Sequence, residues 1–167
     1  MAVAIGAAVA AAGCSTDTNG TPTATADPAA ALWDPCTSIP DEALRASNVD
    51  PANKQSGISG VEQSGWKICK WRGPQYAISI YSTAKGTDEV VHKAGNVDIA
   101  DVTVAGRAGQ QYRAEGASKN LDCDVAFPVA QGTVELEVLG RASLDNPPDP
   151  CKVIADIGPN IVPSFPK

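Results

Sequence analysis

The sequence predicts an α+β domain in which helices cover an antiparallel sheet of about six strands. Several stretches alternate apolar and polar residues with a period of two, which is typical of strands with one buried face. Short turns separate most of these stretches, and such turns join antiparallel rather than parallel strands. Helix-start patterns at Asp34 and Asp149 place helices at both ends of the domain.

The first half of the domain contains a helical region, a loop and a hairpin. Residues 34–48 favour a short helical region, because an Asp-Pro start is followed by small and apolar residues. Residues 50–65 are rich in Gly, Ser, Asn and Gln and predict a loop. Residues 66–71 and 76–81 alternate on either side of the Gly73-Pro74 turn, which predicts a hairpin.

The second half of the domain adds two helices and four strands. Turns are expected around Gly106 and at Gln131-Gly132. The last helix is expected to end at Gly158-Pro159, because proline removes a helical hydrogen bond. In chain order these elements are a helix at 87–93, strands at 97–104, 110–113, 121–127 and 134–138, and a helix at 149–157.

The N-terminus is typical of a bacterial lipoprotein signal. Residues 1–13 are uncharged and apolar, and they end in small residues directly before Cys14. We therefore expect cleavage after Gly13 and lipidation of Cys14, with palmitate among its acyl chains. No Lys or Arg precedes the apolar stretch, so we expect residues 1–13 to be a truncated signal peptide whose natural start lies upstream. The alternative is an Ala-rich soluble helix with a free thiol at Cys14.

The remaining chain divides into a tether and one domain. Residues 14–32 are rich in Thr, Ala, Asp and Pro and predict a disordered tether after the lipidated cysteine. Residues 33–167 predict a single globular domain on the extracytoplasmic face of the cell membrane. The net charge of −6 excludes an electrostatic nucleic-acid binder, which needs a basic face.

The other four cysteines predict two disulfides. An even number of cysteines in an exported chain favours disulfide pairs, and no Cys-x-x-Cys motif indicates a zinc or thioredoxin-type site. Asp34-Pro35-Cys36 recurs as Asp149-Pro150-Cys151, so each copy places a cysteine in the first turn of a helix. Cys69 and Cys123 lie in predicted strands. We therefore expect each helix start to be joined to a strand, through Cys36–Cys69 and Cys123–Cys151.

One acidic patch is a candidate site. In a register that sums to 259, Asp124 lies opposite Glu135 and Asp122 lies opposite Glu137. Like charges directly opposite are unfavourable, so water, neighbouring Lys or Arg, or a cation should relieve them. A solvated acidic face is the favoured interpretation, because no calcium loop motif is present. The sequence therefore predicts no metal site and no cofactor.

No residue set predicts catalysis. His92 is the only histidine, and no Gly-x-Ser-x-Gly motif accompanies it. At the end of a predicted helix, His92 is expected to stabilise the helix dipole. Trp33, Trp66 and Trp71 are candidates for a ligand groove, although core packing is the commoner role of such residues.

Motifs along the chain resemble a family of actinobacterial LprB-like lipoproteins of unknown function. The matching features are Cys14 with its tether, the two Asp-Pro-Cys motifs, Cys69-Lys70-Trp71, Val102-x-Val104-x-Gly106 with Gly109, and Cys123-x-Val125. The resemblance implies a cell-envelope lipoprotein with two disulfides and no assigned catalytic residues. It also implies an α/β/α sandwich similar to the Mog1/PsbP fold.

These observations lead us to expect a non-catalytic binding or adaptor domain. Its partners would be the membrane, through Cys14, and an envelope protein or a small apolar ligand. One alternative is a small-molecule or lipid carrier, which needs an internal cavity. A second alternative is an enzyme, which needs carboxylates or His92 converging in a cleft with shifted pKa values.

Overall fold

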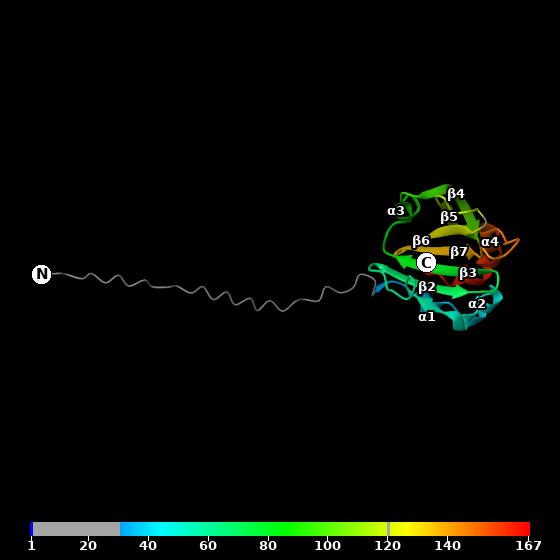
Figure 1. Cartoon of the computed structure of the whole chain (residues 1–167), viewed down its shortest axis with the longest axis horizontal. Helices are drawn as coiled ribbons and strands as arrows, with labels where there is room; N and C mark the ends of the chain where they lie inside the picture. Colours follow the sequence, from blue (N-terminus) through cyan, green and yellow to red (C-terminus); the bar gives the residue numbers. More distant parts are fainter. Residues whose placement is uncertain (2–30, 120) are drawn as a thin grey trace.

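Seven antiparallel strands form a single sheet, which confirms the α+β fold. The computed structural model describes Met1 and residues 31–119 and 121–167, so Cys14 and most of the expected signal peptide and tether lie outside the described residues. The strand order is β1-β2-β3-β7-β6-β5-β4 (Figure 1). The strands are Gln55–Ser56 (β1), Trp66–Arg72 (β2), Tyr76–Thr83 (β3), Asn96–Val104 (β4), Arg107–Ala114 (β5), Asp122–Val129 (β6) and Gly132–Gly140 (β7).

The sheet has one strand more than the sequence predicted. All six expected strands are present, and β1 adds a two-residue pairing between Gln55–Ser56 and β2 at one edge. The composition of residues 50–65 predicts a loop, and β1 is missed because two paired residues are too few to produce an alternating pattern. The helices are Pro35–Ser38 (α1), Asp41–Ala46 (α2), Thr87–Val91 (α3) and Pro150–Ile161 (α4), with short 3₁₀ turns at Pro51–Asn53 and Val162–Ser164.

The expected end of the last helix at Gly158-Pro159 is wrong. Helix α4 continues through Pro159 to Ile161, which is fully buried in the core. Burial of Ile161 offsets the hydrogen bond that Pro159 cannot donate. Gly158 allows this path, because a Cβ atom there would lie 2.2 Å from Val104 Cγ1. The glycine therefore serves close helix–sheet packing rather than termination.

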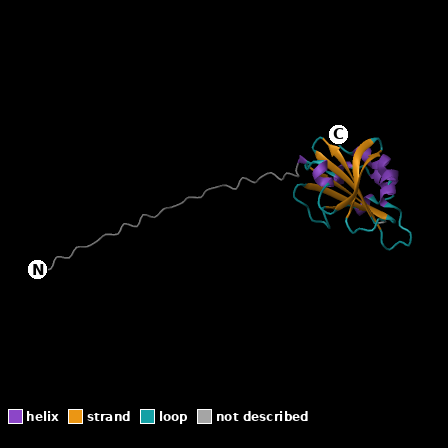
Figure 2. Ribbon diagram, turned by 90° about the horizontal axis from the view of Figure 1, so that it is seen from above, coloured by secondary structure: helices purple, strands orange, loops and turns teal. Residues whose placement is uncertain are grey.

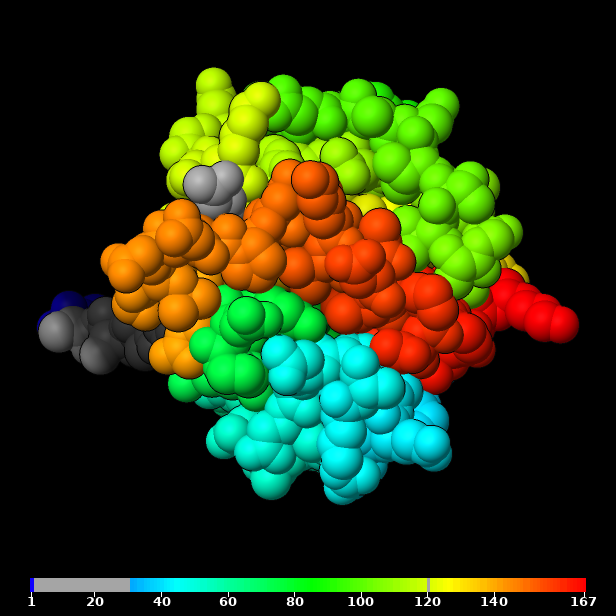
Figure 3. Space-filling view, turned by 90° about the vertical axis from the view of Figure 1, so that its right-hand side faces the viewer, coloured from blue at the N-terminus to red at the C-terminus, as the bar shows by residue number. Residues whose placement is uncertain are grey.

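Helices lie on both sides of the sheet (Figure 2). Helices α1, α2 and α4 cover one face, where the main hydrophobic core lies, and α3 contacts β5, β6 and β7 on the other face. Helix α4 packs against α2 and against β4, so the C-terminal segment lies between the two ends of the sheet (Figure 3). No helix of the described residues is long and apolar enough to cross a membrane.

Both predicted disulfides are present, and each fixes a helix start to the sheet. Cys36 is bonded to Cys69 and Cys123 to Cys151. The Asp34 carboxylate accepts a hydrogen bond from Cys36 N at 2.8 Å, and the Asp149 carboxylate accepts one from Cys151 N at 2.9 Å. In each copy of the Asp-Pro-Cys motif, the aspartate therefore caps the helix and the cysteine links the helix to the sheet.

Candidate functional site

A pocket opens on the face of the sheet that lies opposite the main core. Its volume is about 740 Å³. Strands β2, β3, β5, β6 and β7 form its floor, α3 forms one wall, and the segment 58–64 contributes to another. The lining residues include five acids, two lysines, two tyrosines and one tryptophan: Glu89, Asp122, Asp124, Glu135, Glu137, Lys85, Lys93, Tyr81, Tyr112 and Trp66.

The four acidic residues of the predicted patch all line this pocket, but their register differs from the prediction. Asp124 lies opposite Glu137, and Glu135 lies opposite Ala126, so the pairs sum to 261 instead of 259. The predicted pairs Asp124–Glu135 and Asp122–Glu137 are therefore wrong, because each acid of β6 lies opposite the residue two positions further along β7. The assignment of all four side chains to one face is correct, because a shift of two in the sum leaves each side chain on its face.

Gly132 explains the register. The sequence placed Gly132 in the turn, whereas it is the first residue of β7, paired with Val129, and the turn is Ala130-Gln131. Gly132 has a φ of 137°, and a Cβ atom there would lie 2.3 Å from Thr83 O on the neighbouring strand. Only glycine fits at this position, and it sets where the turn ends and β7 begins.

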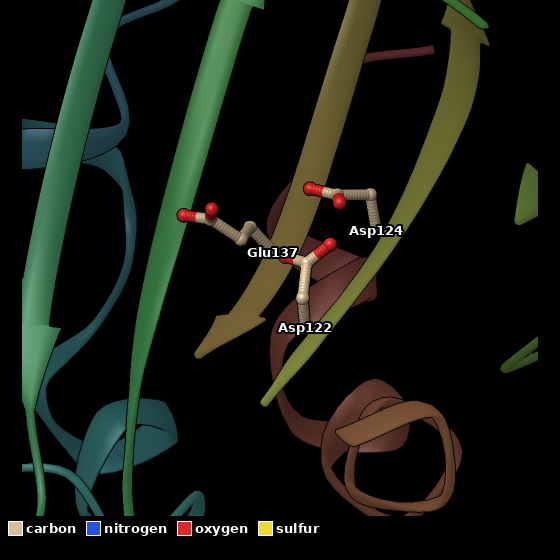
Figure 4. Close-up of side chains that lie close together, drawn as sticks. All are labelled: Asp122, Asp124 and Glu137. Carbon is tan, nitrogen blue, oxygen red and sulfur yellow. The ribbon is translucent and has the colours of Figure 1, made fainter. Parts of the chain in front are cut away.

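Three carboxylates converge on one point of the pocket floor. Asp122 and Asp124 project from β6 toward Glu137 on β7 (Figure 4). One carboxylate oxygen from each residue lies within 4.8 Å of the other two. This separation allows a single small cation to contact all three residues.

The acidic face is not the solvated surface that the sequence favoured. Asp122, Asp124 and Glu135 are only 7%, 6% and 8% exposed. Within the described part of the chain, no Lys, Arg or His forms an ion pair with these residues or with Glu137. The alternation of side chains along β6 and β7 showed which face of the sheet the acids share. It did not show that α3 and the segment 58–64 pack beside that face and shield it from solvent.

Two tyrosines donate hydrogen bonds to the glutamates from opposite sides of β7. Tyr81 Oη on β3 donates to Glu137 at 2.8 Å, and Tyr112 Oη on β5 donates to Glu135 at 2.5 Å. The sequence analysis did not select either tyrosine. A signal was available for Tyr81, because it lies one residue beyond Ile80 and therefore points to the face opposite the core.

Burial and mutual repulsion shift the pKa values of this group upward. Burial is the largest cause at Asp124, where Glu135 and Glu137 add repulsion, and together they raise the pKa to about 10. Burial also raises the pKa of Glu135, to about 7, although the Tyr112 hydrogen bond opposes the shift. The pKa of Glu137 is raised by burial too, against hydrogen bonds from Ser79 and Tyr81.

The remaining candidate residues do not join this group. His92 is the C-cap residue of α3, so it lies at a helix end as predicted, and its Nδ1 lies 3.0 Å from an Asp88 carboxylate oxygen at the surface. Of the three tryptophans, Trp66 lines the pocket and Trp71 is buried in the core. Trp33 packs edge-on against Phe165, at 5.6 Å between ring centres.

Comparison with known proteins places the chain in a family. The family model described as "Protein of unknown function (DUF3558)" matches residues 9–164 of the 167-residue chain. The comparisons with curated proteins and with solved structures found no match. Because the family model covers the whole disulfide-linked sheet and nearly all of the C-terminal segment, the chain belongs to the DUF3558 family of proteins of unknown function.

Proposed function

We propose that this protein is a lipid-anchored extracytoplasmic binding domain that takes a small polar ligand in the pocket over β6 and β7. The observation that carries the proposal is the pocket itself, with a volume of about 740 Å³ and four carboxylates in its floor. A cavity of this size with a few convergent polar groups is typical of a small-molecule site. On this proposal the domain acts by binding and not by catalysis.

The character of the lining favours a polar ligand over a lipid chain. Acids and lysines form much of the surface, and the tyrosine hydroxyls point at carboxylates instead of leaving an apolar wall. A lipid chain would bury these polar groups without hydrogen bonds, which is costly. The apolar ligand expected from the sequence therefore suits this pocket poorly.

The scaffold supports a location outside the cytoplasm. Two disulfides hold the ends of the domain to the sheet, and disulfides persist in oxidising compartments. Lipidation of Cys14 would then attach the domain to the membrane through the chain that precedes residue 31. We also propose that the family includes the actinobacterial LprB-like lipoproteins and that the fold is similar to the Mog1/PsbP α/β/α sandwich.

A second candidate function is an enzyme, because the carboxylates differ in proton affinity. A Glu135 with a pKa of about 7 beside an Asp124 with a pKa of about 10 offers a base and an acid in one cleft. Turnover of a panel of chromogenic esters and glycosides, lost in Glu135→Gln and retained in Asp145→Asn, would favour this candidate over binding alone.

The test of the binding proposal is a ligand screen on the full chain. Native mass spectrometry of the gently purified protein should show a bound small molecule, or a library of polar metabolites should contain compounds that raise its Tm. The same compounds should fail to stabilise Glu137→Gln, whereas they should still stabilise Asp145→Asn, which changes an exposed carboxylate outside the pocket. A protein that retains no small molecule and responds to no compound would contradict the proposal.

A further inference from the structure

We propose that the turn at residues 58–61 contacts the lipid bilayer through Ile58 and Val61 and thereby orients the domain on the membrane. This inference rests on the membrane anchor of the proposed function and goes beyond the ligand pocket. Ile58 is 54% exposed and Val61 is 62% exposed, the highest values among the large apolar residues of the described domain. Exposed apolar side chains that lie together commonly mark a site of contact with a protein or a membrane.

The 58–61 turn holds both apolar side chains on one side. Ile58 N donates to Val61 O at 2.9 Å, and Val61 N donates to Ile58 O at 3.0 Å, so the two residues are direct partners in a short antiparallel pair. The side chains of such partners lie on the same face. Ser59 and Gly60 between them have φ values of 54° and 83°, as in a two-residue turn of type I′. The backbone therefore presents Ile58 and Val61 as one apolar pair.

Contacts at its base hold this turn to the sheet. Gly57 is buried, and its N–H group donates to Ile68 O of β2 at 3.0 Å. On the other side of the turn, Glu62 accepts a hydrogen bond from the Ser56 hydroxyl. Because both ends are held in this way, the exposure of the apolar pair is a property of the fold and not of a loose loop.

The turn lies close to the point where the chain from Cys14 enters the domain. Ser56 pairs with Cys69, and Cys69 is bonded to Cys36 in α1. Lys54 Nζ also donates a hydrogen bond to Cys36 O at 3.1 Å. Helix α1 lies against β2 (Figure 1). A lipid on Cys14 would therefore draw this part of the domain toward the membrane.

The length of the chain before the domain keeps the 58–61 turn within reach of the bilayer. The segment between Cys14 and residue 31 spans at most about 60 Å even when fully extended. An anchor makes a second contact with the same membrane intramolecular, which raises its effective concentration. A contact that is too weak to bind a membrane alone is therefore sufficient to orient an anchored domain.

The small size of the apolar pair favours a bilayer over a protein partner. A stable protein interface buries about 1,000 Å² or more, which two side chains cannot supply. A bilayer accepts apolar side chains from its surface without a complementary shape. The net charge of −6 gives no general attraction to anionic lipids, so we expect the contact to form with neutral phosphatidylcholine too.

Contact through the 58–61 turn places the pocket beside the bilayer. Ile58 is part of the pocket lining, and so are Gln63 and Ser64, which follow the turn. The wall of the pocket and the membrane-contacting turn are thus one continuous segment. In this orientation the pocket takes its ligand at the level of the lipid headgroups.

Methyl NMR of a membrane-attached chain tests the contact. Cys14 is the only cysteine outside the two disulfides, so the full chain can be coupled there to a maleimide lipid in phosphatidylcholine nanodiscs. Spin-labelled lipid should broaden the methyl signals of Ile58 and Val61 at least threefold more than those of Val97 and Ile99. The latter two are exposed apolar residues of the edge strand β4 and serve as internal controls. Equal broadening of both pairs, or none at the turn, would overturn the inference.

A pair of double variants assigns the contact to the turn. In Ile58→Ser/Val61→Ser, broadening of the Gly60 amide signal by spin-labelled lipid should fall at least threefold, whereas Val97→Ser/Ile99→Ser should keep it. Both variants should retain the wild-type Tm, because the replaced side chains are exposed. Undiminished broadening in Ile58→Ser/Val61→Ser would refute the assignment. Dimers of the lipid-free Cys14→Ser chain that this change dissociates would show contact between two copies and overturn the inference as well.

The chemical coupling separates this inference from the proposed function. Attachment through a maleimide lipid does not require lipidation of Cys14 in the cell, so a chain that is never acylated can still show or lack the contact. Binding of a polar ligand by Ile58→Ser/Val61→Ser would leave the proposed pocket intact whatever the membrane result. Failure of the turn to approach the lipid therefore contradicts the orientation alone.

Discussion

The Tyr112 hydroxyl on β5 donates a hydrogen bond to the Glu135 carboxylate on β7, reaching across β6. The residue directly opposite Tyr112 in the sheet is Asp124 and not Glu135, so the bond runs diagonally over the neighbouring strand. The bond gives the most buried glutamate of the pocket a hydroxyl donor, and the Asp124 carboxyl forms a hydrogen bond with the same glutamate. Glu135 is therefore the acid on which the side chains of Tyr112 and Asp124 converge.

Tyr112→Phe should destabilise the protein and raise the pKa of Glu135. Loss of this donor leaves a buried carboxyl without its partner, so the free energy of unfolding should fall by about 1–2 kcal/mol. The pKa of Glu135 should rise further, because the lost bond opposed the upward shift. Urea unfolding and ¹³C carboxyl titration measure the two effects. Tyr81→Phe is the matched control, and it should leave the pKa of Glu135 near the wild-type value.

Stability of the protein should decrease as the pH rises. The pKa values of Glu135 and Asp124 are raised in the folded state, to about 7 and about 10, from 4.5 and 3.8. The folded state therefore keeps protons that the unfolded chain releases above about pH 4, and stability is lost as Glu135 ionises near pH 7. The Tm, measured by thermal unfolding in matched buffers, should fall from about pH 5 to about pH 8.

Asp124→Asn checks this pH dependence. Replacing the acid by its neutral isostere should flatten the pH profile and raise the Tm near pH 8, because one raised pKa is removed. Asp145→Asn should keep the wild-type profile. A profile that stays as steep in Asp124→Asn as in wild type would show that other groups control the pH dependence.

Each disulfide should contribute substantially to stability. They close loops with sequence separations of 33 and 28 residues, which corresponds to about 3–4 kcal/mol each in the chain-entropy model. Cys36→Ser/Cys69→Ser and Cys123→Ser/Cys151→Ser should each lower the free energy of unfolding by about this amount. Cys14→Ser is the control and should unfold like the wild type. Equal stability of oxidised and fully reduced protein would contradict this expectation.

Gly158→Ala should be destabilising although it lies in a helix, where alanine is normally preferred. The added methyl group would meet Val104 Cγ1 at 2.2 Å. A cost of about 1–3 kcal/mol is expected from this overpacking. Val104→Ala should relieve part of that cost in the double variant, and a double-mutant cycle by urea unfolding measures the coupling. If the two changes in unfolding free energy were purely additive, there would be no steric clash between the added methyl group and Val104.

The proposed lipid anchor is tested through Cys14. The wild-type chain, expressed with a complete signal peptide, should incorporate an alkyne-labelled fatty acid and sediment with membranes. Cys14→Ala should lose the label and appear in the soluble fraction with both disulfides intact. A wild-type protein that carries no label would contradict the lipoprotein proposal, while leaving the pocket and the domain unaffected.

Local patterns predicted the parts of the fold that depend on neighbouring residues. The alternation around Ile78 and Ile80 predicted β3 and its buried face, and both are present. The Asp-Pro-Cys repeat predicted two capped helix starts and, with them, the pairing of all four cysteines. Each of these features is determined within a few residues, either by the period of a strand or by one side chain bonding to a nearby N–H group.

The sequence by itself determined that Asp122, Asp124, Glu135 and Glu137 share one face of the sheet, since side chains alternate with a period of two. Only the tertiary structure decided which of them meet and that they are buried. Alternation is unchanged when a strand slides by two residues, so contact between Gly132 and β3 had to set the register. The pocket walls come from α3 and the segment 58–64, which are distant from the acids in the sequence and lie beside them only in the folded protein.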